Sequence, residues 1–237
     1  MSKPFEFKQF SVNQDKCAMK IGTDGVLLGS WSPIDHQPFS ILDIGSGTGI
    51  ISLMLAQRST AQIIEAIEID GDAYEQCSEN FENSPWNNRL FCYHASLLEF
   101  VEEVDEQYNS IICNPPFYSE NYKSNNKARD IARFNDAMPF EHLVYGISKL
   151  LSPDGIFSTI IPYKEEKNFI DLANQAHLKL IKLTRVKGTE NSEIKRSLMS
   201  FSFHSHEPEI SNLIIENSRH NYTKDYIKLT KSFYLKM

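Results

Sequence analysis

The sequence lacks a long apolar run, paired cysteines and histidines at metal-ligand spacing. Its 237 residues contain no apolar stretch of the roughly 20 residues that a membrane helix requires, so we expect no membrane segment. The four cysteines are scattered without a C-x-x-C pair, which indicates reduced cysteines in a cytoplasmic protein; a disulfide framework or zinc site is the alternative. Two of the seven histidines, His204 and His206, lie two positions apart, a pattern more typical of an exposed strand, and we assign no metal.

Basic residues are almost absent between Glu65 and Glu106, where Arg89 is the single base. The formal net charge of −7 argues weakly against nucleic acid as a partner. Bases gather in three other segments: Lys123, Lys127, Arg129 and Arg133; Lys179, Lys182, Arg185, Lys187, Lys195 and Arg196; and Arg219, Lys224, Lys228, Lys231 and Lys236. Segregated bases can form a phosphate-binding face, although solvated helices and hairpins explain them equally well.

Apolar periodicity predicts an α/β fold without internal repeats or a low-complexity linker. Strands alternate with helices from position 39 to 206, which predicts a mostly parallel sheet with helices on both faces, closed by an antiparallel pair. We expect one domain, in which residues 1–38 form a hairpin and helix extension and residues 207–237 a last strand and helix. Such sheets bind ligands at the carboxyl ends of their strands.

A glycine turn, "LDIGSGTG", follows the first strand of this core and contains Gly45, Gly47 and Gly49. Glycines allow a positive φ and let a ligand approach bare backbone. The spacing differs from the G-x-G-x-x-G of dinucleotide-binding turns. Asp43 at the strand end favours a ligand with an ammonium or sulfonium group over a pyrophosphate, and Glu68 at the end of the next strand can accept two ribose hydroxyls.

These features resemble the class I S-adenosyl-L-methionine-dependent methyltransferases, whose D/E-x-G-x-G-x-G turn matches Asp43 to Gly49. The resemblance covers Ile41 to His204. It implies a Rossmann-like sheet of seven strands with an antiparallel last strand, and S-adenosyl-L-methionine as cofactor. It also implies cofactor contacts from Glu68, Ile69, Ser96, Leu97 and Asn114. Ser96 stands where the family often has an Asp for the adenine amine, so backbone groups of Ser96 and Leu97 are the expected substitute.

The stretch "IICNPPFY" follows the fourth strand and contains Asn114, Pro115, Pro116 and Phe117. It resembles the [D/N/S]-P-P-[F/Y] motif of methyltransferases that modify planar amines. The Asn114 side-chain oxygen and the Pro115 carbonyl can each accept an N–H of the amine and so aim its lone pair at the methyl group. The prolines hold that carbonyl rigid, and Phe117 can stack on the base, which is worth about 1–3 kcal/mol. The alternative is an Asn-Pro turn with Phe117 in the core.

Three further segments narrow the choice of substrate. The block "CAMKIGTDGVLLGSW" (17–31), with "KARDIAR" and the tail "YTKDYIKLTKSFYLKM", is similar to the tRNA1(Val) adenine N6-methyltransferase family over essentially the whole chain. This resemblance implies methylation of the adenosine just 3′ of the anticodon of a valine tRNA, so the expected partner is a tRNA anticodon stem-loop. The alternatives are another planar amine (rRNA guanine or adenine, or a release-factor glutamine) and a non-catalytic RNA-binding module.

Residue roles outside the two main motifs are hypotheses. Lys20 and Thr23 could bind the methionine carboxylate of the cofactor, and Asp24 its ammonium; the alternative is a helix start capped by Thr23. We expect the tail 218–237 to be one amphipathic helix with aromatics that pack in the core, and the protein to be a monomer. Four bases that follow the NPPF motif are expected to bind anticodon-loop phosphates: Lys123, Lys127, Arg129 and Arg133.

Overall fold

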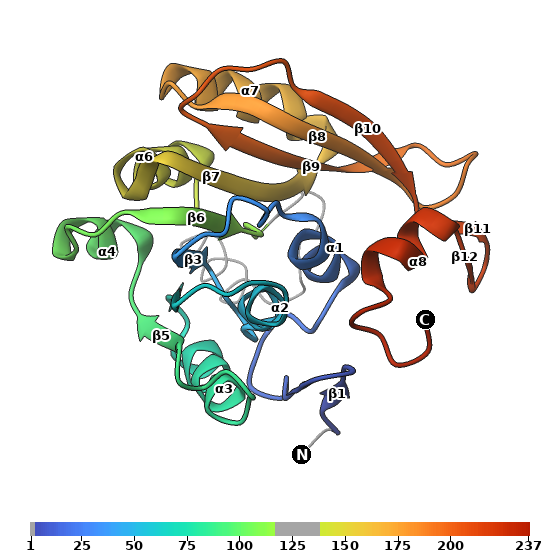
Figure 1. The fold of residues 1–237 in the computed structure, drawn as a ribbon, viewed down its shortest axis with the longest axis horizontal. Coiled ribbons are helices and arrows are strands. Elements are labelled where there is room, and N and C mark those ends of the chain that lie inside the picture. The colour runs from blue at the N-terminus through green and yellow to red at the C-terminus, as the bar shows by residue number, and fades with distance from the viewer. Residues whose placement is uncertain (1–2, 117–137) are drawn as a thin grey trace, which may run out of the picture.

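The computed structural model describes residues 3–116 and 138–237 and shows an α/β fold built on one large sheet (Figure 1). Its eight strands lie in the order β10-β8-β9-β7-β6-β3-β4-β5. In chain order they are β3 (Ser40–Ile44), β4 (Ile63–Glu68), β5 (Leu90–His94), β6 (Tyr108–Cys113), β7 (Leu151–Pro162), β8 (Lys179–Lys187), β9 (Ile194–Ser202) and β10 (Glu209–Ile214). The helices are α1 (Thr23–Trp31), α2 (Ile50–Arg58), α3 (Gly71–Glu82), α4 (Leu97–Glu103), α6 (Phe140–Leu150), α7 (Glu166–Gln175) and α8 (Lys224–Thr230), with a 3-10 helix, η1, at Tyr163–Glu165.

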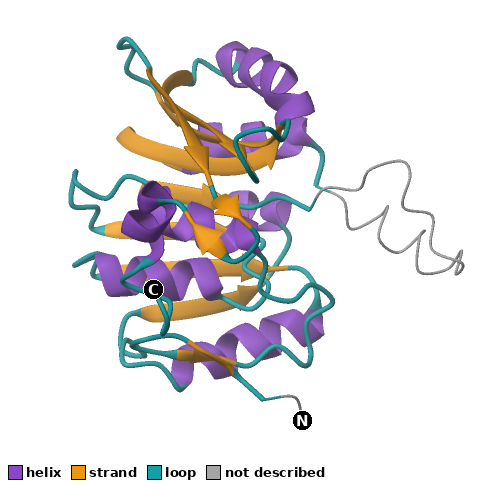
Figure 2. Ribbon diagram, turned by 90° about the vertical axis from the view of Figure 1, so that its right-hand side faces the viewer, coloured by secondary structure: helices purple, strands orange, loops and turns teal. Residues whose placement is uncertain are grey.

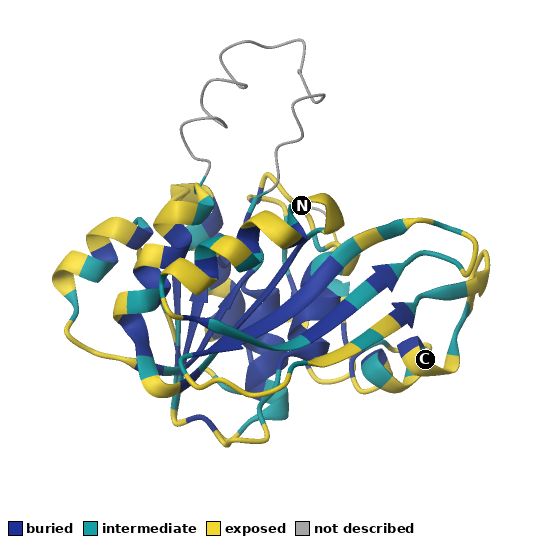
Figure 3. Ribbon diagram, turned by 90° about the horizontal axis from the view of Figure 1, so that it is seen from above, coloured by how far each residue is buried: buried dark blue, intermediate teal, exposed yellow. Residues whose placement is uncertain are grey.

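Helices cover both faces of the sheet, as the alternation of strands and helices predicted. Figure 1 shows α1, α2 and α8 on one side of the sheet and α4 and α6 on the other. Successive residues of β3 point to opposite faces: Ile41 packs in the core cluster with α1, α2 and α3, whereas Leu42 packs in the cluster with α4, α6 and α7. The central strands are buried on both faces, which is why they are apolar runs (Figure 3).

The sheet has one strand more than the seven expected. β9 runs antiparallel to both β7 and β8, as predicted for the closing strand. β10 then adds to the outer side of β8 in parallel, with Glu209 opposite Lys182 and Ile214 opposite Lys187. Most residues of β10 are exposed or half-buried, which is typical of an edge strand. Figure 2 shows the strands of the sheet stacked one above another.

The two ends of the described chain lie against each other. β1 (Phe5–Glu6) pairs with β2 (Ser11–Val12), and Phe7 forms an isolated bridge with Tyr234. Two more short strands, β11 (Glu216–Ser218) and β12 (Asn221–Tyr222), pair before α8 begins. The expectation of one helix over 218–237 is therefore wrong.

A side-chain cap sets where α8 begins. The Thr223 hydroxyl accepts a hydrogen bond from the backbone N–H of Tyr226 at 3.2 Å, and residues before it are held in the β11–β12 pair. The expected core packing of the tail aromatics is confirmed: Tyr226 and Phe233 are buried, and Tyr222 and Tyr234 pack against the same cluster. None of the helices in the described ranges has the length and hydropathy that a bilayer crossing requires.

Candidate active site

The glycine turn and the NPP turn begin side by side at one edge of the sheet. β3 and β6 are neighbouring parallel strands, and their last residues, Ile44 and Cys113, are register partners. Adjacent strands lie about 5 Å apart. Gly45 and Asn114 therefore leave the sheet next to each other, at the carboxyl edge where doubly wound sheets bind ligands.

The three glycines of the turn all have left-handed backbones, with φ of 71° at Gly45, 55° at Gly47 and 76° at Gly49. Their surroundings differ. A Cβ on Gly47 would meet nothing within 4 Å, so the space over this residue is open. A Cβ on Gly49 would lie 2.6 Å from Phe81 Cε1 and 2.9 Å from Cys77 Sγ. Gly47 thus leaves bare backbone for a ligand, whereas Gly49 allows α2 to pack against α3.

Asp43 is a fully buried carboxyl group beneath this turn. Its Oδ2 accepts hydrogen bonds from the Ser52 hydroxyl at 2.7 Å and from the Ser52 backbone N–H at 3.2 Å. Its Oδ1 has no hydrogen-bond partner. Burial raises the pKa of Asp43 to about 7, although the bonds from Ser52 lower it. An unpartnered, buried carboxylate oxygen suits a ligand with positive charge, because such a ligand stabilises the ionised form.

Glu68, at the end of β4, links the glycine turn to α3. Its Oε2 accepts a hydrogen bond from the Gly47 N–H at 2.7 Å, and its Oε1 accepts one from the Asp70 N–H at 3.0 Å. The carboxylate is thereby fixed at the carboxyl edge beside the open backbone of Gly47. Each carboxylate oxygen has a further lone pair with which it can accept a hydrogen bond from a hydroxyl group.

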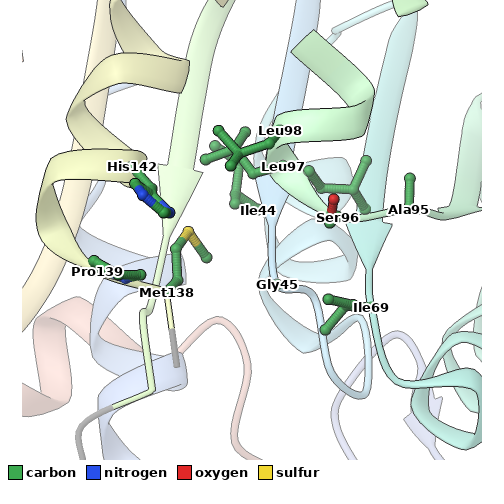
Figure 4. A pocket seen from close by; sticks show the side chains of 11 residues that line it. Ile44, Gly45, Ile69, Ala95, Ser96, Leu97, Leu98, Met138, Pro139 and His142 are labelled. Carbon is green, nitrogen blue, oxygen red and sulfur yellow. The ribbon is translucent and has the colours of Figure 1, made fainter. Parts of the chain in front are cut away.

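A cavity of about 170 Å³ opens beside Gly45, between the ends of β3, β4 and β5 and the start of α6 (Figure 4). Ile69, Ser96 and Leu97, all expected at the cofactor, line it. Figure 4 shows Met138 and His142 on the side opposite Ser96 and Leu97. No sequence pattern marked Met138 or His142 as site residues, because their place depends on how α6 packs against the sheet.

Ser96 is the N-cap of α4, a role that the sequence interpretation missed. Its hydroxyl accepts a hydrogen bond from the Glu99 N–H at 3.3 Å, and the Glu99 carboxylate accepts one from the Ser96 N–H at 3.0 Å. The signal was present, since Ser followed three residues later by Glu is the capping-box signature. The Ser96 N–H is thus already bonded, whereas Leu97 is the first residue of α4 and its N–H has no acceptor within the helix.

Curated proteins from several bacteria match the chain over its full length. A protein of Flavobacterium psychrophilum named tRNA1(Val) (adenine(37)-N6)-methyltransferase is 64% identical over 98% of this chain and 100% of its own length. Proteins of the same name from Bacteroides fragilis and Pseudoalteromonas translucida are 44% and 43% identical, over 98–100% of this chain.

The chain belongs to the tRNA1(Val) (adenine(37)-N6)-methyltransferase family. The resemblance inferred from the sequence is confirmed. A family model described as a methyltransferase small domain also matches, over residues 26–137, which include both turns of the site.

Solved structures support the Rossmann-like fold of this family member. A predicted O-methyltransferase from Agrobacterium tumefaciens superposes with a TM-score of 0.69 at 19% identity, covering 89% of this chain and 96% of its own. A putative RNA methyltransferase from Pyrococcus horikoshii gives a TM-score of 0.51 at 15% identity, over 70% of this chain and 74% of its own. These likenesses show the fold of the methyltransferase core.

The described residues include Asn114, Pro115 and Pro116 of the NPPF motif but not Phe117 or the residues that follow it up to position 137. Pro115 is buried, and Asn114 and Pro116 are half-buried. Five predicted site residues fall outside the described ranges: Phe117, Lys123, Lys127, Arg129 and Arg133. All four cysteines have free thiols. Residues 3–116 and 138–237 contain no group of three or more His, Cys, Asp or Glu side chains placed to hold a metal ion.

The predicted methionine-binding residues lie at the start of α1. Gly22, not Thr23, is the N-cap, and it makes no side-chain cap bond, so the capping alternative for Thr23 is wrong. Asp24 Oδ2 accepts a hydrogen bond from Arg196 Nε at 2.8 Å. Thr23 and Asp24 do not line the cavity beside Gly45, and Lys20 precedes the helix. Their cofactor roles stay predictions.

Proposed function

We propose that this protein transfers a methyl group from S-adenosyl-L-methionine to the exocyclic amine of adenosine 37 in tRNA1(Val). The observation that carries the proposal is the register of Ile44 with Cys113, because it sets the NPP turn beside the glycine turn. An acceptor amine held by the NPP turn would then lie next to a methyl donor held by the glycine turn. The full-length relatives that carry this activity in their name support the choice of substrate.

The residues at the glycine turn fit S-adenosyl-L-methionine, which supplies an electrophilic methyl group on a sulfonium sulfur. Glu68 would accept the ribose hydroxyls, and the open backbone at Gly45 and Gly47 would lie against the donor. Ile69 would cover the adenine face, and the Leu97 N–H would donate to a ring nitrogen. The charge of Asp43 would favour the cation, with Lys20, Thr23 and Asp24 proposed at its methionine end.

The NPP turn would orient the acceptor amine rather than ionise it. The lone pair of an adenine amine is delocalised into the ring, so this nitrogen is a poor nucleophile. Hydrogen bonds accepted by the Asn114 side chain and by the Pro115 carbonyl would hold both amine hydrogens and direct the lone pair at the methyl carbon. Phe117 would stack on the base, which offsets the few kcal/mol spent in flipping it out of the anticodon loop.

The proposed reaction also requires that the protein bind the anticodon loop of the tRNA. Four basic residues outside the described ranges are proposed to contact anticodon-loop phosphates: Lys123, Lys127, Arg129 and Arg133. We further propose that the protein acts as a monomer in the cytoplasm, where its free thiols would stay reduced.

Nucleoside mass spectrometry tests the proposed activity directly. In a strain that lacks the protein, N6-methyladenosine should disappear from tRNA1(Val) and remain in other RNAs, and purified protein should restore it to tRNA1(Val) from that strain. Loss of a methylated guanine from rRNA, or of a methylated glutamine from a release factor, with tRNA1(Val) unchanged would contradict the proposal.

Donor affinity should depend on pH through Asp43. Because the pKa of this carboxyl is raised to about 7 in the folded protein, its charge is incomplete at neutral pH. Donor affinity should therefore rise from about pH 6 to about pH 8 as the carboxylate forms beside the sulfonium. By the same shift, Asp43 favours folding at low pH, and this contribution is lost as pH rises through about 7.

Calorimetric titration with S-adenosyl-L-methionine across this range measures the effect. Asp43→Asn should bind the donor more weakly at pH 8 and should remove the rise of affinity with pH, and a thermal melt of this variant checks that it is folded. A rise of the same size in Asp43→Asn would assign the pH dependence to another group.

A further inference from the structure

A second cavity, of about 360 Å³, lies between the start of α1 and the ends of β8 and β9. Three basic residues, Lys187, Lys195 and Arg196, line it together with one acidic residue, Asp24. The lining is thus net positive in a chain whose formal charge is −7. Such a local concentration of bases on an acidic protein is what binding of a phosphate group requires.

The two lysines of this cavity are open to an incoming anion. The Lys187 ammonium donates to the Glu190 carbonyl oxygen at 3.2 Å and forms no ion pair among the described residues. The side chain of Lys195 is 65% exposed, and its carboxylate neighbour, Glu193, is 3.7 Å away and 90% exposed. An exposed pair of this kind contributes little, so either lysine can exchange its present contacts for a phosphate.

Arg196 and Asp24, which both line the cavity, form an ion pair. Arg196 Nε lies 2.8 Å from Asp24 Oδ2, and both side chains are about one-third exposed. The pair largely offsets its own charge and leaves the two lysines as the net charge of the site. Thr23 at the first turn of α1 also lines the cavity, so backbone N–H groups without helical acceptors lie near it.

This cavity lies at the same edge of the sheet as the NPP turn. β8 is antiparallel to β9, which is antiparallel to β7, so β8 and β7 both end at the edge where β6 ends. Arg196 is the register partner of Pro162, the last residue of β7, and of Val186 in β8. The loop after β8 is partly exposed there, beside the start of α1.

We propose that the cavity lined by Lys187, Lys195 and Arg196 binds a backbone phosphate of the tRNA substrate. The inference rests on the proposed function and adds a phosphate site built from residues other than the basic residues at 123–133. A tRNA whose adenosine 37 reaches the NPP turn has a backbone that extends beyond the flipped base, and this cavity lies along the same edge. Lys187 and Lys195 supply the charge, and Arg196 positions the start of α1 through Asp24.

Charge reversal of the two lysines tests the site. Steady-state methylation of unmodified tRNA1(Val) should show the KM for tRNA of Lys187→Glu/Lys195→Glu raised at least about tenfold, with kcat within about twofold of wild type. The slope of log binding constant against log salt concentration should become less steep by about 1, because the two lysines together neutralise one phosphate. The affinity for S-adenosyl-L-methionine should be unchanged.

Lys179→Glu/Lys149→Glu is the matched control. Lys179 begins β8 and Lys187 ends it, so they lie roughly 25 Å apart on one strand. Lys149 is in the last turn of α6. The net charge change is identical, but the control should leave KM and the salt slope close to wild type.

Each outcome decides one claim. Equal effects of the two double variants would overturn the phosphate site and leave only a nonspecific effect of net charge. Unchanged KM and slope in Lys187→Glu/Lys195→Glu would also overturn it. Failure of the wild-type protein to methylate tRNA1(Val) would instead contradict the proposed function. Lys187→Gln/Lys195→Gln, which only neutralises the charge, should show a smaller rise of KM and covers the case in which the reversed variant fails to fold.

Discussion

Asn114→Ala should lower the turnover number for tRNA methylation by at least about a hundredfold, the usual cost of one hydrogen bond made to the reacting group. The variant loses an acceptor for the amine and one expected donor contact, but the contacts proposed from Glu68, Ile69 and Leu97 remain, so affinity for S-adenosyl-L-methionine should stay within about twofold. Single-turnover methylation of tRNA1(Val), with calorimetry of donor binding, measures both quantities.

Asn83→Ala is the control for this experiment. Asn83 follows α3 and is exposed, and its side chain donates only to the Glu79 carbonyl, so its removal should leave turnover unchanged. Asn114→Ala turnover within about threefold of wild type would mean that the NPP turn does not orient the amine. No turnover by the wild-type protein would instead support a binding module without catalysis.

Gly49→Ala and Gly47→Ala should separate packing from ligand access within one turn. Both residues have positive φ, which costs an alanine about 1–2 kcal/mol. At Gly49 the new methyl group also collides with Phe81 and Cys77, and overpacking of this kind costs a further 1–3 kcal/mol or so. The unfolding free energy of Gly49→Ala should therefore fall by roughly 2–5 kcal/mol.

Gly47→Ala should lose only the backbone part of that stability, because a Cβ there meets no atom within 4 Å. Its methyl group would instead occupy space proposed for the donor, so donor affinity should fall about tenfold or more, which corresponds to about 1.4 kcal/mol. Urea denaturation and calorimetry of both variants provide the comparison. Equal losses of stability would show that the collision at Gly49 is relieved by movement of Phe81.

Most of the fold could be predicted from the sequence because the patterns that mark its strands, turns and helices are local. An apolar run followed by "GSGTG" predicts a strand and a left-handed turn, and the residue pattern from Ile41 to Ser202 predicts the order of strands and helices. The parallel neighbours β3 and β6 follow from the doubly wound topology, so the meeting of the two turns could be expected. A strand within residues 207–237 was expected, but its pairing beside β8 was not, since six residues of mixed polarity at Glu209–Ile214 specify no pairing partner.

The sequence by itself therefore determined which groups stand at the candidate site: the glycine turn, Asp43, Glu68 and the NPP turn are each set by short-range patterns at strand ends. The tertiary structure alone decided which distant side chains join them. Arg196 reaches Asp24 across 172 positions, and Lys187 and Lys195 share a cavity with the start of α1. The physical reason is that strand pairing and the packing of α1 and α6 bring these residues together, and neither a residue's type nor its spacing encodes a contact over that separation.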